Sequence, residues 1–510
     1  MHWSKIFRNV FSNWASYLVT AIVGFTLAPI VVHSLGNTGY GLWTLVLSLT
    51  GYFGLLDLGI RSSVGRFVAR HLALEDHQRV NATVSTAFAM LSAAGLLALM
   101  ATLVMVELFF GSFKVEPQYA ASGRIALLIT GLNMACILPF SVFSATLIGL
   151  ERFDVVSGVT IVGELLRAAL VVSSLRMGYG LVTLALISLF LTVSEYSAMA
   201  IFVKMLYRPL RLSFCFLDRT VFRELFGFGI YRFIWIVANQ LIFYSDSVVI
   251  GVMLGAASIT YYAIAGSLIN YGRNVVSLVT DTLAPAAARL DAKEDRAGLQ
   301  RLLVLGTKLA LMIGMPLCLG FLFLGKQFIT LWMGKAYASS AAYLAVLTIP
   351  QFGSMAQYTS ALILAGMARH RSLALFALAE GLANLILSVL LAQKIGLMGV
   401  AWGTVIPDLL CTTLVVPLYT LNVLKLSVRD YLRKAWLPPA LCAVPVVGLG
   451  IAFSALSPAP SWLMFGAEAA AFCTVFGGMA YFVCLDSAQR ARLVEKLGSM
   501  FRREAVVGEA

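Results

Sequence analysis

The chain of 510 residues is 60% hydrophobic and only 12% charged, whereas soluble domains carry about 25% charged residues. A soluble protein of this size needs a charged surface, which this composition cannot supply. The formal net charge of +13 does not require nucleic acid, because the basic residues lie in short segments between apolar stretches, where they are typical of loops that face an anionic leaflet. The composition therefore predicts a polytopic membrane protein that contacts membrane lipids and binds no nucleic acid.

The first apolar stretch follows Lys5 and Arg8. A secretory signal peptide has a shorter apolar core and a small-residue cleavage site, so this stretch predicts an uncleaved first span. Thirteen more stretches follow, each long enough to cross a hydrocarbon core of about 30 Å. The fourteen predicted spans are residues 11–34, 39–60, 80–110, 120–149, 155–175, 180–203, 225–253, 257–285, 302–325, 338–366, 372–392, 396–421, 436–456 and 461–484.

The loops between the spans predict the orientation of the chain. With the N-terminus in the cytoplasm, 27 of the 37 Lys and Arg residues fall in cytoplasmic segments and six in outside loops. Because short cytoplasmic loops carry an excess of Lys and Arg, both termini are expected in the cytoplasm.

The gaps between spans are too short for a soluble catalytic or nucleotide-binding domain. The seven cysteines lie mostly inside apolar stretches and show no metal-ligand spacing, so they are interpreted as small hydrophobic residues. We therefore expect neither an enzyme nor a bound cofactor or metal.

A charged segment interrupts the apolar sequence twice in the same way. A shift of 219 residues aligns residues 35–76 with residues 254–295 without a gap. Ten of the 42 columns are identical, among them Arg70, Glu75 and Asp76 with Arg289, Glu294 and Asp295. Shared apolar composition does not reproduce a polar pattern, so the match predicts an internal repeat.

The repeat predicts the architecture of an all-α membrane protein with about fourteen transmembrane helices. Two six-helix lobes in the same orientation would be related by an axis along the membrane normal, as in transporters built from parallel repeats. The predicted domains are a first lobe (1–206), a cytoplasmic linker (207–224), a second lobe (225–424), two further helices (425–485) and a basic cytoplasmic tail (486–510).

The segment "LGNTGYGLWTLVLSLTGYFGLLDLGIRSSVGRFVARHLALED" (35–76) resembles the opening of bacterial O-antigen and exopolysaccharide flippases. In that family the first span is followed by a Gly-Tyr-Gly turn, a "DLG" near the end of the second span and a basic cytoplasmic loop. The segment "IGLMGVAWGTVIPDLL" (395–410) resembles the glycine-rich entry to the family's twelfth span. The likeness extends over nearly the whole chain.

The resemblance implies membership of the multidrug/oligosaccharidyl-lipid/polysaccharide exporter superfamily. It implies alternating access in the bacterial inner membrane, with a sugar unit on undecaprenyl pyrophosphate moved from the cytoplasmic to the outer leaflet. Polysaccharide polymerase or export proteins are the expected protein partners. Because one fold hosts several functions, the choice of cargo has to come from the residues of the site.

Charged residues at membrane depth are hypotheses of function by default, since each is costly unless it is paired or faces water. Arg273 lies deep in its span, and a guanidinium binds phosphate through two parallel hydrogen bonds. The basic residues that predict contact with pyrophosphate or an acidic sugar are Arg273, Arg232, Lys308 and Arg61. Arg167 is also intramembrane, but Glu164 lies one turn away and is expected to pair with it.

Acidic residues in the spans predict coupling to a cation. A buried carboxylate can load a proton or sodium ion on one side of the membrane and release it on the other. The candidates are Asp246, Asp281 and Asp408. Asp281 lies two turns from Arg273, so it is also close enough to pair with that arginine through water.

Two other functions compete with the flippase. An exporter of cationic drugs would share the fold but needs an acidic cavity, which Arg273 and Arg232 disfavour. A membrane-embedded polysaccharide polymerase or glycosyltransferase usually has a sizeable outside loop with acidic and histidine residues, and the predicted outside loops are short.

Overall fold

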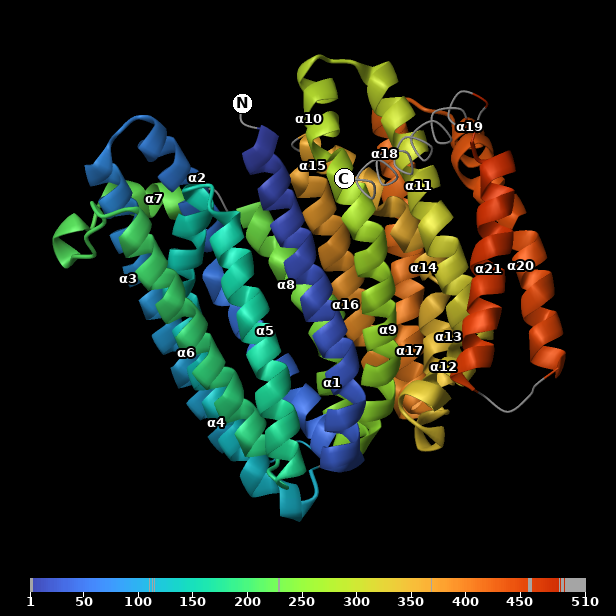
Figure 1. Cartoon of the computed structure of the whole chain (residues 1–510), viewed down its shortest axis with the longest axis horizontal. Coiled ribbons are helices and arrows are strands. Elements are labelled where there is room, and N and C mark those ends of the chain that lie inside the picture. The colour runs from blue at the N-terminus through green and yellow to red at the C-terminus, as the bar shows by residue number, and fades with distance from the viewer. Residues whose placement is uncertain are drawn as a thin grey trace, which may run out of the picture. The chain divides into compact units, whose positions relative to one another are not determined.

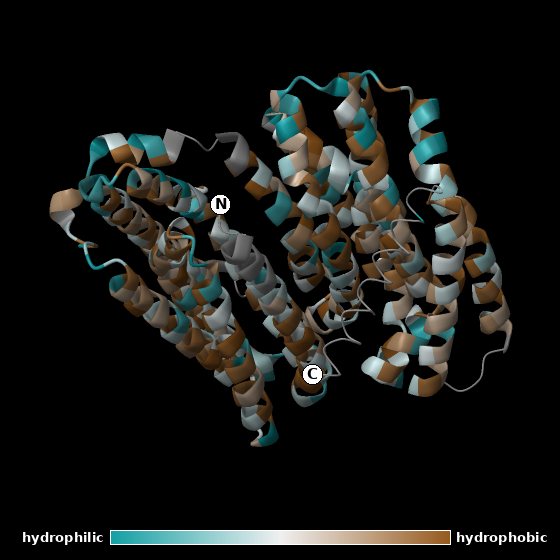
Figure 2. Ribbon diagram, turned by 45° about the horizontal axis from the view of Figure 1, so that its top comes forward, coloured by the Kyte–Doolittle hydropathy of each residue, from teal (hydrophilic) through white to brown (hydrophobic). Residues whose placement is uncertain are grey.

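The computed structural model describes residues 3–227 apart from 110, 112 and 114, then residues 230–367, 369–456, 461–485, 487 and 490. Every regular element within these residues is a helix. Apolar residues cover most of the length of the helices in each unit, and polar residues gather mainly near the turns (Figure 2). The expected all-α membrane protein is thereby confirmed.

The described chain divides into two compact units. Unit 1 comprises Met1–Ala263 and Ala377–Thr404, and unit 2 comprises Ile264–Phe376 and Val405–Ala510. Unit 1 thus contains the first predicted lobe together with segments from the second. The predicted lobe boundaries stay a prediction.

The first half of the chain contains nine long or medium helices among the described residues. They are α1 (Trp3–Gly51), α2 (Ile60–Ala73), α3 (His77–Val104), α4 (Pro117–Gly149), α5 (Phe153–Arg176), α6 (Leu181–Leu206), α7 (Arg219–Gly227), α8 (Ile230–Met253) and α9 (Ala256–Thr280). In unit 1, α3, α4, α5 and α6 lie side by side (Figure 1).

The second half is more interrupted. Its helices are α10 (Ala284–Ala292), α11 (Arg296–Phe323), α12 (Gly325–Trp332), α13 (Ser340–Thr348), α14 (Gln351–Ser354), α15 (Tyr358–Gly366), α16 (His370–Ile395), α17 (Leu397–Asp408), α18 (Val416–Leu424), α19 (Val428–Tyr431), α20 (Leu437–Leu456) and α21 (Trp462–Val483). Short 3₁₀ or π-helical segments join several of them, including η5 (Asp281–Leu283), η7 (Met355–Gln357) and η8 (Leu409–Val415).

Within the described residues, eleven helical stretches are long and apolar enough to cross a membrane, against fourteen predicted spans. The first two predicted spans fall in one helical stretch, Ser12–Asp57, which bends at Gly36 with φ of 70°. The predicted span 338–366 is divided into the short helices α13, α14 and α15. Helix α9, which carries Arg273, is not among the eleven. The count of fourteen stays a prediction.

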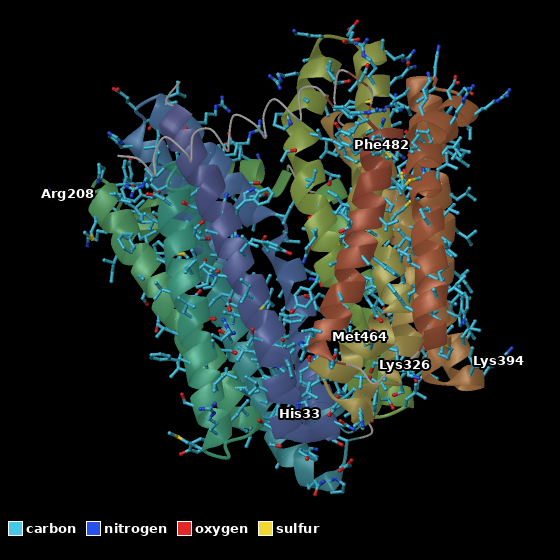
Figure 3. The ribbon with its side chains drawn as sticks, turned by 45° about the vertical axis from the view of Figure 1, so that its right-hand side comes forward. His33, Arg208, Lys326, Lys394, Met464 and Phe482 are labelled. Atoms are coloured by element: carbon cyan, nitrogen blue, oxygen red, sulfur yellow. The ribbon has the colours of Figure 1, made fainter. Side chains whose placement is uncertain are left out.

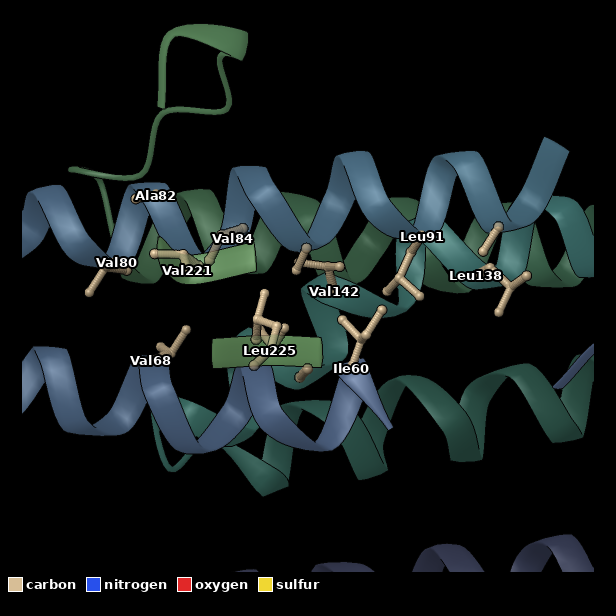
Figure 4. Packing of buried hydrophobic residues seen from close by; sticks show 14 of the residues in the cluster. Ile60, Val68, Val80, Ala82, Val84, Leu91, Leu138, Val142, Val221 and Leu225 are labelled. Carbon is tan, nitrogen blue, oxygen red and sulfur yellow. The ribbon is translucent and has the colours of Figure 1, made fainter. Parts of the chain in front are cut away.

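The core of unit 1 joins helices from distant parts of the sequence. Ile60 and Val68 of α2, Val80 of α3 and Val142 of α4 are all buried in one cluster. Figure 4 shows α7 against the same cluster, where Val221 and Leu225 are nearly inaccessible. Part of the predicted cytoplasmic linker is therefore packed onto unit 1.

The linker is also held by the polar side of α3. The Asn81 side-chain amide donates to the carbonyl oxygen of Pro209 at 3.2 Å and accepts from the backbone N–H of Arg211 at 3.0 Å. The carboxylate of Asp218 accepts from the backbone N–H and hydroxyl of Thr220, and these hydrogen bonds lower the pKa of Asp218. These contacts satisfy backbone groups that a loop would otherwise leave to water.

The two charged segments that match at the 219-residue shift have the same local structure. Helices α3 and α11 are both 28 residues long and begin at matching positions. Glu75 and Glu294 before them have φ of 57° and 55°. Asp76 then caps α3 by accepting from the N–H of Arg79 at 2.9 Å, and Asp295 caps α11 by accepting from Gly298 at 2.8 Å. The side-chain oxygen of Asp satisfies a free N–H of the first helical turn in each case.

Unit 2 includes the two helices that follow the predicted second lobe. Helix α21 runs from the end marked by Met464 to the end marked by Phe482, and Lys326 lies at the Met464 end (Figure 3). Phe472 and Phe476 of α21 pack with Cys442 and Val446 of α20 in one buried cluster. Helix α11 contacts both of these helices.

Candidate functional site

Unit 2 contains a half-buried arginine that donates hydrogen bonds to two buried side chains. Arg273 on α9 donates through Nε to Oε1 of Gln351 at 2.8 Å and through Nη2 to Oδ2 of Asp408 at 3.2 Å. The Arg273 and Asp408 side chains are 19% and 4% exposed. We call Arg273, Gln351 and Asp408 the Arg273 site.

Prolines place both partners of Arg273 at the ends of helices. Pro350 precedes α14, so Gln351 begins a new short helix. Pro407 lies just before Asp408, the last residue of α17, and the π-helical segment η8 follows. Proline lacks the N–H that continues a helix, and π-helical turns are frequent at functional sites.

A glycine lets these two elements approach. A Cβ added at Gly353 of α14 would clash with the side chain of Thr413 in η8. The close contact brings Gln351 and Asp408 to the same guanidinium.

The carboxylate of Asp408 is only partly satisfied. Its Oδ2 accepts from Arg273, whereas its buried Oδ1 has no hydrogen-bond partner. A buried, unsatisfied carboxylate oxygen is costly, and breaking a buried ion pair leaves an uncompensated charge. The Arg273 site is therefore an ion pair in which one carboxylate oxygen is satisfied and the other is not.

Unit 1 contains a different carboxylate site around Asp246, which is 6% exposed on α8. Its Oδ2 accepts from the hydroxyl groups of Tyr262 on α9 at 2.6 Å and Thr404 on α17 at 2.8 Å, and its Oδ1 accepts from Ser388 on α16 at 3.4 Å. We call Asp246, Tyr262, Ser388 and Thr404 the Asp246 site. No basic side chain forms an ion pair with Asp246 among the residues that the structure describes.

Close packing of α16 and α17 brings the hydroxyl groups together. A Cβ at Gly403 would clash with Ser388, so glycine is needed for this approach. Next to the site, Ser245 donates to Oδ1 of the buried Asn384 at 3.2 Å. Oxygen ligands with one negative charge and no basic partner suit a small monovalent cation or a proton.

The structure describes the side chains of three of the four other predicted candidates. Lys308 on α11 donates through Nζ to the carbonyl oxygen of Cys484 at 2.9 Å and so satisfies a carbonyl at the end of α21. Arg61 is exposed near the start of α2, and its backbone N–H donates to Oδ1 of Asp57 at 3.2 Å. Asp281 is exposed on η5. The side chain of Arg232 on α8 lies outside the described residues.

One predicted pairing is confirmed. Nε of Arg167 lies 3.4 Å from Oε2 of Glu164, as expected from their spacing of one turn. The sequence allowed Asp281 to pair with Arg273 through water, and the structure adds a direct contact of Arg273 with the carboxylate of Asp408. This contact depends on the tertiary fold, because Arg273 and Asp408 lie 135 positions apart in the sequence.

Sequence reasoning missed the neutral members of both sites. Gln351, Tyr262, Ser388 and Thr404 carry no charge, and serine and threonine in apolar helices commonly bond to their own backbone. Thr404 itself also approaches the carbonyl oxygen of Val400, at 3.2 Å. The break at Pro350 was the one signal that could have drawn attention to Gln351.

No group of three or more His, Cys, Asp or Glu residues that could hold a metal ion is present in the described part of the chain. The candidate sites are therefore built on single carboxylates, one with a guanidinium and one with hydroxyl groups.

The family model described as "Polysaccharide biosynthesis protein" matches residues 6–291. The chain belongs to this family. A relative from Shigella flexneri, named "Putative O-antigen transporter", is 22% identical over 420 residues, which is 82% of this chain and 98% of that protein.

Two solved structures share the fold of this family member. The lipid II flippase MurJ in an inward closed conformation superimposes with a TM-score of 0.71 at 15% identity, over 93% of this chain and 98% of that one. A multidrug resistance MATE family transporter of the MOP superfamily in an inward-facing conformation gives a TM-score of 0.70 at 13% identity, over 80% and 94%. All three relatives are named as transporters or flippases, and none as an enzyme. The two structures show that this chain shares their fold.

Proposed function

We propose that this protein moves undecaprenyl-pyrophosphate-linked oligosaccharide units from the cytoplasmic to the outer leaflet of the bacterial inner membrane by alternating access. Both termini would lie in the cytoplasm, and the units would serve the synthesis of O-antigen, capsule or exopolysaccharide. The observation that carries the proposal is the half-buried guanidinium of Arg273, held by Gln351 and Asp408, in a member of a polysaccharide biosynthesis family.

A pyrophosphate group inside a membrane protein is best bound by a basic side chain that keeps its positive charge when it is partly removed from water. Guanidinium remains charged under all ordinary conditions and presents a planar set of donors that matches phosphate oxygens. Gln351 holds Nε of Arg273, which restricts the rotation of the guanidinium. The arginine is thus prepared to bind a phosphate with less loss of conformational entropy.

The name of the MATE relative raises the alternative of a drug exporter. A cationic drug would need a carboxylate, and Arg273 already occupies the carboxylate of Asp408. An anionic cargo therefore fits the Arg273 site better than a cationic one.

Cation coupling is proposed at the Asp246 site. Its carboxylate is buried and bound by three neutral hydroxyl groups, so its charge is available to a sodium ion or a proton. Asp281 is exposed and Asp408 is paired with Arg273, which leaves Asp246 as the strongest of the three predicted coupling residues. The membrane potential contributes about 2.3 kcal/mol per charge for each 100 mV crossed.

The test is a deletion of the gene in its own host, followed by extraction of the polyprenyl-linked sugars. Their sidedness is measured with a probe that cannot cross the inner membrane. Units that accumulate on the cytoplasmic face, and are restored by the wild type but not by Arg273→Ala, are the expected result. Finished but unpolymerised units on the outer face would indicate a polymerase, and unchanged lipid-linked sugars would refute the flippase.

A matched control keeps the test specific to the site. Arg167→Ala removes an arginine that pairs with a neighbour on its own helix and is expected to restore transport.

A further inference from the structure

We propose that Asp408 is an internal substitute for the cargo's phosphate, and that it takes up one monovalent cation when the pyrophosphate replaces it at Arg273. This inference rests on the proposed function, because it requires an anionic cargo at that arginine. It assigns Asp408 the role of a positioning residue that links cargo binding to cation uptake.

The geometry separates the contact that holds Arg273 from the contact that can be exchanged. Gln351 is 2% exposed and binds Nε, while Asp408 binds Nη2. Loss of the Asp408 contact therefore leaves the guanidinium attached to α14. A phosphate oxygen that approaches Nη2 competes with Oδ2 of Asp408 for the same donor.

When phosphate replaces Asp408 at Arg273, the negative charge of the Asp408 carboxylate is left without its cation. Asp408 is 3% exposed, its Oδ1 already has no hydrogen-bond partner, and a buried carboxylate without its cation is strongly unfavourable. Uptake of a proton or a sodium ion at this carboxylate removes the penalty. Cargo binding and cation binding then favour each other, because such coupling is reciprocal.

The surroundings of Asp408 contain few other charges that could take this role. Arg273 of α9 is the charged group that acts on Asp408. Tyr358 of α15 lies within electrostatic reach of Arg273, Asp408 and Asp281 of η5. On α14, Gln351 and Ser354 are neutral, and the hydroxyl of Ser354 also lies close enough to the Asp408 carboxylate to act on it.

The test is calorimetric titration of the purified full chain in nanodiscs with farnesyl pyrophosphoryl-N-acetylglucosamine. Each phosphate of this probe has one ester bond, the shared anhydride bond and a single strongly acidic oxygen, so the probe itself does not change charge near neutral pH. Titrations in sodium-free buffers of different ionisation enthalpy count the protons taken up, and titrations at several sodium concentrations count sodium ions. We expect about one cation per bound probe, so that the dissociation constant changes about tenfold for each tenfold change in that cation.

Asp408→Asn is expected to bind the probe with no dependence on pH or sodium, because nothing remains to be neutralised. Glu468→Gln removes another buried carboxylate of unit 2, on α21; it is the matched control and is expected to retain the dependence. Probe binding by the wild type without any cation uptake would overturn the inference, as would a dependence that survives in Asp408→Asn. The wild-type measurement decides the point even where the variant fails to fold.

A double variant separates this inference from the proposed function. Arg273→Gln with Asp408→Asn removes both charges and leaves no uncompensated carboxylate. If this variant binds the probe as the wild type does, the proposed anion site itself is wrong. If it loses binding while the wild type shows no cation uptake, only the role of Asp408 is wrong.

Discussion

The Asp246 site and the Arg273 site both bury an aspartate in an apolar helical unit, yet they satisfy it in opposite ways. Asp246 receives three hydrogen bonds from neutral hydroxyl groups. Asp408 receives one from a guanidinium and keeps an oxygen without a partner. Hydrogen bonds from hydroxyl groups orient a carboxylate without neutralising it, whereas an arginine neutralises it and occupies the position of an added cation.

This difference separates two roles for residues of the same type. In our proposals, Asp246 attracts a cation whether or not cargo is present. Asp408 attracts one only after the cargo phosphate has replaced it as the partner of Arg273. Four predictions follow this contrast, from the largest expected effect to the smallest.

Replacing the guanidinium should affect transport most. Arg273→Ala removes the guanidinium that is proposed to donate hydrogen bonds to the phosphate. It also leaves the buried carboxylate of Asp408 without its ion-pair partner, so we expect delivery of lipid-linked sugars to the outer leaflet to be abolished. Arg273→Lys keeps a charge but loses the planar set of donors, and hydrogen bonds to charged groups are worth about 1.5–3 kcal/mol each. The sidedness assay should show a loss of at least about tenfold for Lys. Normal delivery by Arg273→Ala would contradict the site.

Removing the charge of the other aspartate should abolish coupling but preserve cargo binding. Asp246→Asn retains a similar shape and can still accept from the hydroxyl groups. We expect transport into proteoliposomes to lose its response to a sodium or proton gradient, while the affinity for the farnesyl probe stays unchanged. A retained gradient response together with a lost probe affinity would reverse the roles that we assign to the two aspartates.

Removing single hydroxyl groups should produce graded versions of that effect. Tyr262→Phe and Thr404→Val each delete one donor to Oδ2 of Asp246, and each donor to a charged group is worth about 1.5–3 kcal/mol. We expect the cation concentration for half-maximal transport to shift in both variants, with a larger shift for Tyr262→Phe because its bond is shorter. Thr420→Val is the control, since Thr420 bonds only to the carbonyl oxygen of Val416 among the contacts described. Equal shifts in all three variants would argue against a specific site.

Lys308 tests whether any half-buried basic residue of unit 2 could bind the cargo. Its ammonium binds the carbonyl oxygen of Cys484, so Lys308→Met should cost about 1 kcal/mol of stability and leave probe binding unchanged. Thermal unfolding and calorimetric titration of the same sample in nanodiscs measure both quantities. A loss of probe binding without a loss of stability would indicate that Lys308 contacts the cargo, as the sequence predicted.

The sequence was sufficient where a property depends on composition or local spacing. Apolar length predicted a helical membrane protein, and eleven helical stretches meet that criterion. The matching charged segments around residues 76 and 295 have the same local structure because an aspartate caps the helix that follows it in both places. The pairing of Glu164 with Arg167 followed from one helical turn.

The tertiary structure decided which buried charges act together. Arg273 and Asp408 were both candidates from their depth in apolar sequence, but only the approach of α14 to η8 joins them and adds Gln351. The hydroxyl groups around Asp246 come from three separate helices, and neutral residues give no signal in a charge pattern. Depth in the membrane follows from position along one helix, whereas the partner of a buried charge depends on the contacts between helices that are far apart in the sequence.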